Sequence, residues 1–237
     1  ETRPNVTTFE ATAALLQDVQ QGSCFVRPLP SSLQKIVPLI RPRRNNYFFG
    51  RSRELLELCN ALQPGRVVTI CGTGGVGKSA LAAEIVWSLA PAGSAPEKFP
   101  DGIVYFSFQT EPHAEKALQA IALAYHVAPL PLPAIAVQQV LSGKHALLVL
   151  DGADQADNLT LVLRQIGNCG VLITSRKHIP LADKSYDLGS LEPDVSLAML
   201  QTLASQQTTN VGASKTIVQI LDGLPFALFL AAKYLTN

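Results

Sequence analysis

Residues 72–79 read Gly72-Thr73-Gly74-Gly75-Val76-Gly77-Lys78-Ser79, and this stretch decides the fold of the chain. It fits the phosphate-loop pattern G-x-x-x-x-G-K-[ST] without mismatch. Such a loop needs glycine because its backbone curls tightly and turns its N–H groups inward, toward phosphate oxygens. In this pattern Lys78 reaches the β and γ phosphates, and the hydroxyl of Ser79 coordinates magnesium. The stretch therefore predicts a site for a nucleoside polyphosphate with Mg²⁺.

The residues on either side of the loop provide the strand and the helix that the pattern requires. Arg66 to Cys71 is an apolar, β-branched run that predicts a strand, and Ser79 to Ala90 predicts a helix. The N-terminus of that helix favours phosphate because its free N–H groups and its dipole both attract anions. The residues expected around the phosphates are Thr73, Gly74, Gly75, Val76, Gly77, Lys78, Ser79 and Ala80.

A phosphate loop also needs a carboxylate that orients the metal, at the end of a neighbouring strand. Leu147 to Leu150 are four consecutive apolar residues, and Asp151 follows them directly. An aspartate after an apolar strand usually belongs to a turn or a helix cap, and here the phosphate loop favours the metal role instead. The predicted magnesium ligands are therefore Ser79 and Asp151, the latter acting through water.

Strands and helices alternate through the central part of the chain. Beyond the strand before the loop, strands are predicted at residues 102–108, 145–150 and 170–174, with a short one at 186–188. Thr110-Glu111-Pro112 predicts the start of a helix, because it combines an N-cap, an acidic first turn and a proline. Apolar strands that alternate with helices predict an α/β three-layer sandwich with a mostly parallel sheet.

The chain divides into three predicted segments. Residues 1–47 are expected to form a helix and then a proline-containing arm, whose Arg41, Arg43 and Arg44 resemble a solvated linker. Residues 48–190 form the predicted nucleotide-binding domain. Residues 191–237 show only helical patterns, interrupted at Gly223-Leu224-Pro225, and predict a small helical lid.

Composition excludes several classes of protein. Hydrophobic residues make up 47% of the 237 residues, and the formal net charge is +1. The apolar content predicts a full core, while the near-zero charge and the lack of a basic stripe make nucleic acid an unexpected partner. No apolar run is long enough for a membrane span, so we expect no membrane partner. Because the chain begins with Glu1 rather than Met, we expect it to be an excised part of a longer protein.

The cysteines and histidines suggest no second metal site in the sequence. The four cysteines, at 24, 59, 71 and 169, form no CxxC or similar spacing. They are typical of reduced, mostly buried thiols in a cytoplasmic protein. The four histidines are also widely scattered, so His178, which lies near the expected phosphate edge, is assigned a structural role.

Together with these two motifs, the rest of the chain resembles the NB-ARC branch of the STAND ATPases, which includes plant disease-resistance receptors and apoptosis activators. The resemblance runs from about Phe48 to Leu235. It is carried, in the family's order, by Phe48-Phe49-Gly50-Arg51 with Glu54, Cys71 to Leu81, Ile103 to Gln109, Thr174-Ser175-Arg176, Leu191 to Leu200, and Gly223 to Leu228.

The resemblance implies roles for several of these residues. Phe48, Phe49, Gly50 and Arg51 are expected to pack on the adenine, Pro225 to abut the adenosine, and Arg176 to sense the γ-phosphate. The implied ligands are ADP or ATP with Mg²⁺. The implied function is a switch in immunity or cell-death signalling, linked to effector and sensor domains in the same chain. We expect the activated full-length protein to form a homo-oligomer and this fragment to be a monomer.

Two departures from the family pattern affect these expectations. NB-ARC domains usually place a second acid after the magnesium aspartate, and Gly152 stands there instead. The run Asp151-Gly152-Ala153-Asp154 is more similar to the NACHT branch, so Asp154 is the expected residue that orients the attacking water. Gln155 replaces the glutamate that NACHT domains often carry, which predicts slow hydrolysis. Members of the family also continue into a winged-helix domain, which the resemblance implies after Asn237.

Other functions of a phosphate loop remain alternatives at this point. A multi-turnover ATPase or a small-molecule kinase shares the loop, although no acceptor pocket or arginine-rich lid is apparent in the sequence. A GTPase would carry an Asn/Thr-Lys-x-Asp segment after the fourth strand, and no such segment is present. The order of the motifs and the helical lid favour the slow switch.

Overall fold

The computed structural model describes residues 37–205, 207–208 and 210–236. The helix predicted within residues 1–22, and the part of the predicted arm before residue 37, lie outside these residues. The described residues belong to one compact unit that begins at Val37.

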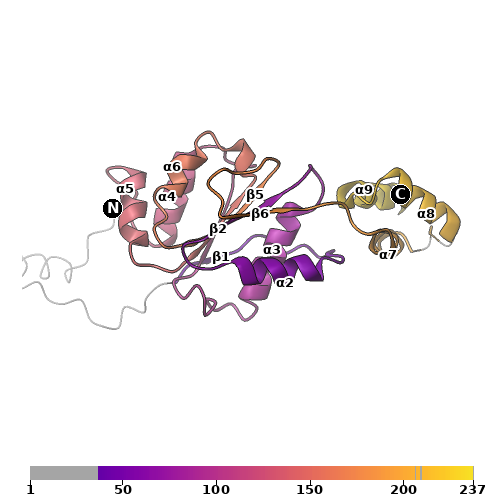
Figure 1. Ribbon diagram of the computed structural model, residues 1–237, viewed down its shortest axis with the longest axis horizontal. Coiled ribbons are helices and arrows are strands. Elements are labelled where there is room, and N and C mark those ends of the chain that lie inside the picture. Colours follow the sequence, from indigo (N-terminus) through magenta and orange to yellow (C-terminus); the bar gives the residue numbers. More distant parts are fainter. Residues whose placement is uncertain (1–36, 206, 209, 237) are drawn as a thin grey trace, which may run out of the picture. The chain divides into compact units, whose positions relative to one another are not determined.

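A six-stranded parallel sheet forms the centre of this unit (Figure 1). The strands lie in the order β1-β3-β4-β5-β2-β6, and every neighbouring pair is parallel. The strands are β1 (Leu39–Ile40), β2 (Val67–Cys71), β3 (Ile103–Ser107), β4 (Leu147–Asp151), β5 (Gly170–Ser175) and β6 (Lys184–Asp187). The predicted α/β fold with a parallel sheet is confirmed.

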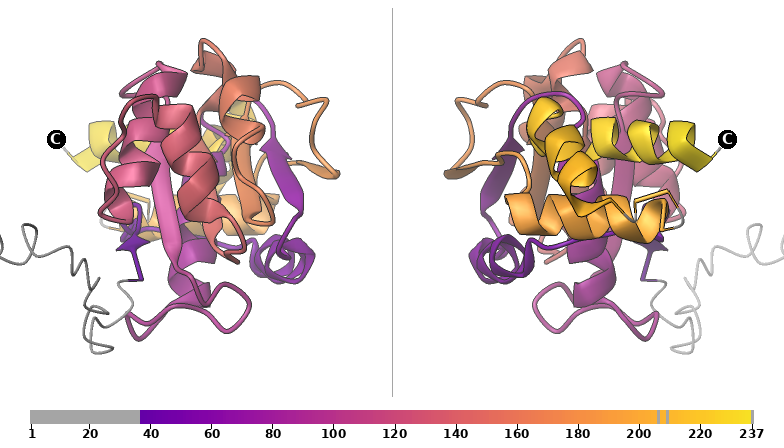
Figure 2. Two further views of the ribbon diagram at one scale, coloured as in Figure 1. Left: turned by 90° about the vertical axis from the view of Figure 1, so that its left-hand side faces the viewer. Right: turned by 90° about the vertical axis from the view of Figure 1, so that its right-hand side faces the viewer.

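Helices cover both faces of the sheet, as the views in Figure 2 show. One face packs against α2 (Ser52–Ala61) and α3 (Lys78–Leu89). The other face packs against α4 (Ala114–Ala124), α5 (Pro133–Leu141) and α6 (Leu159–Leu163). Strand β4 shows why an uninterrupted apolar run suits this position. Its Leu147 and Val149 join the core with α2 and α3, while Leu148 and Leu150 join the opposite core.

The parallel register brings the functional residues to one edge of the sheet. Cys71 at the end of β2 is paired with Ser175 of β5 and with Asp187 of β6. Ser107 at the end of β3 is paired with Asp151 of β4. Ligands of open parallel sheets bind beyond these carboxyl ends, so this edge is the expected site.

Three helices follow the sheet and form a subdomain with its own core (Figure 1). They are α7 (Pro193–Leu203), α8 (Val211–Ile220) and α9 (Pro225–Thr236). Leu200 and Leu228 are completely buried in this core. The predicted interruption is present, since Gly223 adopts a φ of +61° and Pro225 opens the first turn of α9.

Two features differ from the predictions. Strand β1 belongs to the sheet although it precedes residue 48, and Arg41 and Arg44 contact residues of α3 and its C-terminal end. The Arg41 guanidinium lies 3.9 Å from the ring centre of Trp87 and donates to the carbonyl of Ala90, and Arg44 pairs with Glu84 at 2.7 Å. These contacts hold the segment before residue 48 against α3.

Helix α4 begins at Ala114, two residues after the proline that was predicted to open it. Its first N–H group is capped from another part of the chain, because Asp157 accepts a hydrogen bond from the Ala114 N–H at 2.8 Å. None of the helices in the described part of the chain is long and apolar enough to cross a membrane.

Candidate nucleotide site

The loop between β2 and α3 has the conformation that its glycines predict. Gly75 and Gly77 have φ angles of +79° and +99°, which a side chain would strain. The ammonium of Lys78 lies over the loop and donates to the carbonyls of Gly72 and Thr73, each at 2.8 Å. Burial lowers the pKa of Lys78, against the opposing effect of Asp154.

The two predicted magnesium ligands lie together. The Ser79 hydroxyl donates to Oδ1 of Asp151 at 2.6 Å, and Asp151 is only 3% exposed. The Thr174 hydroxyl also donates to Asp151 and accepts a hydrogen bond from the N–H of Gly152 at 2.8 Å, so it fixes the carboxylate. Hydroxyl and carboxylate oxygens are the donors that Mg²⁺ prefers, so these residues fit the ion.

Tyr105 of β3 holds the other oxygen of Asp151, donating to Oδ2 at 3.2 Å. Burial, followed by the charge of Asp151, raises the pKa of Tyr105 to about 12. The phenol therefore stays protonated at neutral pH and acts as a donor to the carboxylate.

Arg176 and Asp154, predicted to act on the γ-phosphate and on water, form an ion pair with each other. Burial raises the pKa of Asp154, but the hydrogen bonds from Arg176 outweigh it, and the pKa lies below its ordinary value. The Asp154 side chain is 9% exposed, while that of Arg176 is 58% exposed. The pair uses Nε and the backbone N–H of Arg176, so a phosphate contact would be made by the Nη groups of this exposed side chain.

Gln109 is a site residue that the motif analysis missed. Its amide Nε2 lies 3.4 Å from both the Ser79 hydroxyl and Oδ2 of Asp151. It also occupies the space beside Gly152, where an added Cβ would lie 2.6 Å from Cγ of Gln109. The Gln109 side chain thus fills the position of the family's second acid, and a side chain at residue 152 would require Gln109 to move. Gln109 ends the family-like stretch Ile103 to Gln109, but that stretch assigned it no role, and the pairing of β3 with β4 is what brings it close to Asp151.

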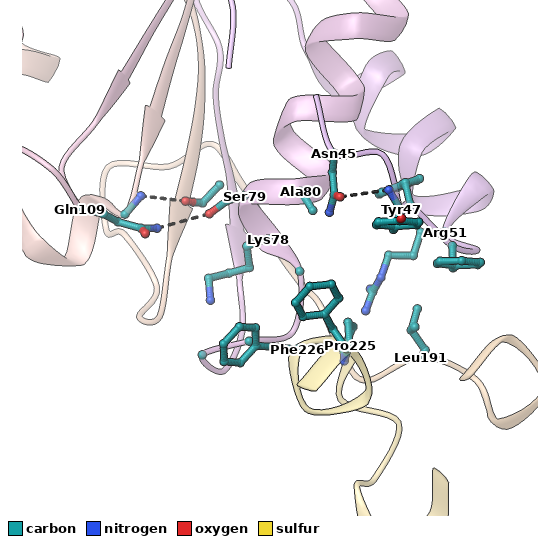
Figure 3. Close-up of a pocket in the computed structure, with 18 of the residues that line it drawn as sticks. Asn45, Tyr47, Arg51, Lys78, Ser79, Ala80, Gln109, Leu191, Pro225 and Phe226 are labelled. Carbon is teal, nitrogen blue, oxygen red and sulfur yellow. Dashed lines mark hydrogen bonds between the residues drawn. The ribbon is translucent and has the colours of Figure 1, made fainter. Parts of the chain in front are cut away.

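A cavity of about 580 Å³ extends from the phosphate loop to the helical subdomain (Figure 3). Of the predicted site residues, those that line it are Phe48, Phe49, Arg51, Gly74, Gly75, Gly77, Lys78, Ser79, Ala80, Asp154, Arg176 and Pro225. Those that do not line it are Gly50, Thr73, Val76 and Asp151. Val76 is buried in the core, and Gly50 packs against Val195.

Other residues of this cavity carried no sequence signal of their own. Asn45 and Tyr47 lie at one side, where the Asn45 side chain accepts a hydrogen bond from the Tyr47 N–H at 3.0 Å (Figure 3). Met199 and Phe229 come from the helical subdomain, for which the sequence predicted helices but no contact with a ligand. Leu191, which opened a predicted lid helix, also lines the cavity.

Arg51 lines the cavity, but its guanidinium mainly holds the backbone. Nη2 donates to the carbonyl of Val76 at 3.0 Å and to that of Gly189 at 2.8 Å. The Arg51 side chain is 5% exposed and also lies 3.6 Å from Glu54. Burial lowers the pKa of Arg51, against the opposing charge of Glu54. One buried cation thus ties the phosphate loop to the segment that leads into the helical subdomain.

Helix α9 contacts the phosphate loop directly. The N–H of Phe226 donates to the carbonyl of Gly75 at 3.2 Å. A Cβ added at Gly75 would lie 3.0 Å from Cβ of Phe226, and one at Gly77 would lie 3.9 Å from Cγ of Pro225. The first turn of α9 therefore packs against the glycines of the loop. Figure 3 shows Pro225 and Phe226 lining the same pocket as Lys78.

The family model of the NB-ARC domain matches residues 52–210, more than half of the chain. The chain belongs to the NB-ARC domain family. The phosphate loop, the buried aspartate of β4 and helix α7 lie within the matched residues and are thus parts of an NB-ARC domain, a type of P-loop nucleotide-binding module.

Several curated proteins that are similar in sequence to this NB-ARC chain are named as regulators. The chain is 28% identical over 222 residues to the regulatory protein AfsR of Streptomyces coelicolor, a match that covers 84% of this chain and 22% of AfsR. The chain spans about a fifth of the length of the curated relatives it matches.

Solved structures share the fold of this NB-ARC chain. The Walker-type ATPase PABY2304 of Pyrococcus abyssi superposes with a TM-score of 0.57 at 14% identity, covering 85% of this chain and 72% of that one. The ORC2 protein of Aeropyrum pernix, solved as ADPNP and ADP complexes, superposes with a TM-score of 0.51 at 15% identity, covering 69% and 54%.

Proposed function

We propose that this NB-ARC domain is a slow nucleotide switch that binds ADP or ATP with Mg²⁺ and controls a larger regulatory protein. The observation that carries the proposal is the shared cavity. One end is the phosphate loop with Lys78 and Ser79, and the other is formed by Leu191, Pro225 and other residues near and within the helical subdomain. A nucleotide of matching length touches both parts at once.

The apolar end of the cavity is suited to bind a nucleobase, and the polar end is suited to bind phosphates. Phe48, Phe49, Leu191 and Pro225 offer apolar surface on which an adenine ring can pack. Lys78, the loop N–H groups and the start of α3 offer positive charge and donors to the phosphates. The ADPNP and ADP complexes of the ORC2 protein, which shares the fold, agree with an adenine nucleotide.

The residues of the polar end have distinct proposed roles in hydrolysis. Ser79 and Asp151 hold the magnesium, and Lys78 stabilises the charge that develops on the transferred phosphate. Arg176 contacts the γ-phosphate, and Asp154 and Gln109 orient the attacking water. Because the lowered pKa of Asp154 makes it a weak proton acceptor, we expect slow turnover.

The contacts around the loop provide the proposed route from nucleotide to regulation. Arg51 and the Phe226 N–H both bind carbonyls of the phosphate loop, at Val76 and Gly75. A ligand that changes the loop therefore changes the free energy of these contacts with the segment after β6 and with α9. In the full-length protein this shift would expose a surface for homo-oligomerisation, in line with the regulatory role of AfsR.

Mass spectrometry of the nucleotide released when the purified protein is denatured tests the proposal. Bound ADP would support the switch, and bound GDP would overturn the adenine assignment. If no nucleotide co-purifies, calorimetric titration with ADP and Mg²⁺ decides the matter, and an absence of binding there would refute the proposal.

The rate of phosphate release separates the switch from the alternative of a multi-turnover ATPase or kinase. Release faster than about one phosphate per second per chain would be ordinary enzyme speed. We expect a much slower release, with ADP remaining bound after a single turnover.

A further inference from the structure

Three chemically different side chains meet at the carboxyl edge of the sheet, outside the nucleotide cavity. They are Cys71 at the end of β2, Asp187 at the end of β6 and His178 in the loop after β5. Cys71 and Asp187 are direct partners in the parallel register, so the fold itself places them side by side. His178 and Asp187 follow Cys71 by 107 and 116 residues, which is why no sequence spacing marks the three as a group.

The distances among the three side chains are close to those of a tetrahedral metal site. Their ligand atoms all lie within 4.8 Å of one another, and Nε2 of His178 is 3.3 Å from Oδ1 of Asp187. Zinc bonds of about 2.0 to 2.2 Å to nitrogen and oxygen place two such ligands about 3.3 Å apart, and a thiolate about 3.6 Å from either. The imidazole–carboxylate edge therefore already has the required length.

Small movements of two exposed side chains would bring the remaining distances, those to the Cys71 sulfur, to the values of a zinc site. The side chains of His178 and Asp187 are 66% and 76% exposed, so each is able to rotate toward the thiol. Cys71 is fixed, being 2% exposed, with its Sγ 3.5 Å from the carbonyl of Lys177. Rotation of the two exposed side chains can therefore complete the coordination of an ion that has reached the buried thiol from solvent.

The ligand types select the metal. A thiolate, an imidazole and a carboxylate suit Zn²⁺, whereas Mg²⁺ prefers oxygen ligands such as those of Ser79 and Asp151. Burial, followed by the charge of Asp187, raises the pKa of the Cys71 thiol. Binding would therefore release the thiol proton to solvent as the sulfur–metal bond forms.

We infer that Cys71, His178 and Asp187 form a zinc-binding site at the base of the phosphate loop, with the fourth position left to water. Cys71 is bonded directly to Gly72, whose carbonyl accepts the hydrogen bond from Lys78, and His178 is two residues from Arg176. The site is independent of the proposed switch, because none of its ligands lines the nucleotide cavity.

Titration of the reduced, metal-free protein with Co²⁺ tests the inference. We expect one equivalent to produce a near-ultraviolet thiolate-to-cobalt band and visible tetrahedral bands, and Zn²⁺, but not Mg²⁺, to abolish them. Cys71→Ser should remove the thiolate band, and His178→Gln and Asp187→Asn should each weaken Co²⁺ binding by tenfold or more. The thiolate band itself separates this site from the nucleotide site, because the predicted magnesium ligands Ser79 and Asp151 contain no sulfur.

Matched controls come from the same fold. Cys169→Ser removes another buried thiol whose Sγ lies near a backbone carbonyl, that of Lys144 at 3.7 Å. His113→Gln removes another histidine that is paired with an aspartate, Asp157 at 3.0 Å. Both should bind Co²⁺ as the unmodified chain does.

Three outcomes would overturn the site. They are the absence of a thiolate band in the unmodified protein, its persistence in Cys71→Ser, and unchanged affinity in both His178→Gln and Asp187→Asn. The last two variants change exposed side chains, so they keep the test decisive if Cys71→Ser does not fold.

Discussion

Nε of Arg176 lies 2.7 Å from Oδ2 of Asp154, and the backbone N–H of Arg176 lies 3.0 Å from the other carboxylate oxygen. The pair joins the loop after β5 to the short helix η1 (Ala153–Gln155) after β4. It joins the two residues with different expected roles: Arg176 in sensing the γ-phosphate, and Asp154 in orienting the attacking water.

This pair predicts that Asp154→Asn weakens hydrolysis without weakening ATP binding. The neutral amide loses the charge that holds Arg176, so the guanidinium is free to reach the γ-phosphate, while the water loses its acceptor. We expect turnover to fall at least tenfold, with the Kd of ATP unchanged or lowered. Single-turnover kinetics and calorimetry measure the two quantities. An unchanged rate would remove Asp154 from the proposed mechanism.

The lowered pKa of Asp154 also predicts how its contribution to stability depends on pH. A carboxylate whose folded pKa lies below its ordinary value of about 3.9 contributes stability above that value, and loses it as pH falls through the folded pKa. The difference in unfolding free energy between the unmodified chain and Asp154→Asn should therefore be constant from pH 5 to pH 8 and shrink below about pH 4. Denaturant unfolding at several pH values measures it, and a difference that shrinks near neutral pH would contradict the prediction.

Replacement of Lys78 by alanine should weaken nucleotide binding strongly. Hydrogen bonds to a charged group contribute about 1.5 to 3 kcal/mol, which corresponds to roughly a 10- to 100-fold rise in Kd. Lys215→Ala, in the exposed part of α8, is the matched control and should bind as the unmodified chain does. Equal affinities of both variants for ADP with Mg²⁺ would remove the basis of the proposed function.

Gly152→Ala should destabilise the fold through its contact with Gln109. The φ of +71° alone costs an alanine about 1 to 2 kcal/mol, and its Cβ would also lie 2.6 Å from Cγ of Gln109. Gln109→Ala should recover the steric part of the loss in the double variant, but not the backbone part. Denaturant unfolding of the two single variants and the double variant measures this coupling. Strictly additive losses would show that the two residues do not compete for space.

Arg51→Ala should destabilise the fold more than a typical surface substitution. It leaves the carbonyls of Val76 and Gly189 without their charged donor, at an expected cost of about 2 to 4 kcal/mol. Arg51→Lys should recover little, because one ammonium does not reproduce the planar fork. Arg53→Ala is the control, since that side chain is 88% exposed and pairs with Glu57 at the surface, so the free energy of unfolding should stay nearly unchanged.

The sequence predicted the fold and the phosphate end of the site because these depend on local patterns. The loop of residues 72–79, the apolar run before Asp151 and the interruption at Gly223 each carry their geometry within a few residues. The approach of Ser79 to Asp151 also followed, because the carboxyl ends of parallel strands share one edge.

The features that were not predicted depend on contacts between distant residues. Asp157 caps α4 from 43 positions away, and Arg51 binds the carbonyl of Gly189 across 138 positions. Gln109 lies beside Gly152 only through strand pairing, and the short strand β1 has no periodicity that marks it. A single sequence contains no local pattern that reports such pairs.

Strand β1 has a practical consequence for work with shortened forms of the chain. The NB-ARC match begins at residue 52, but β1 covers the outer side of β3, where the carbonyl of Pro38 accepts a hydrogen bond from the N–H of Ile103 at 2.8 Å. A protein trimmed to begin at residue 52 would leave that side of β3 open, with free N–H and C=O groups beside apolar side chains. Such an open edge is a template for pairing between molecules, so the trimmed form would tend to aggregate where the longer one stays dispersed.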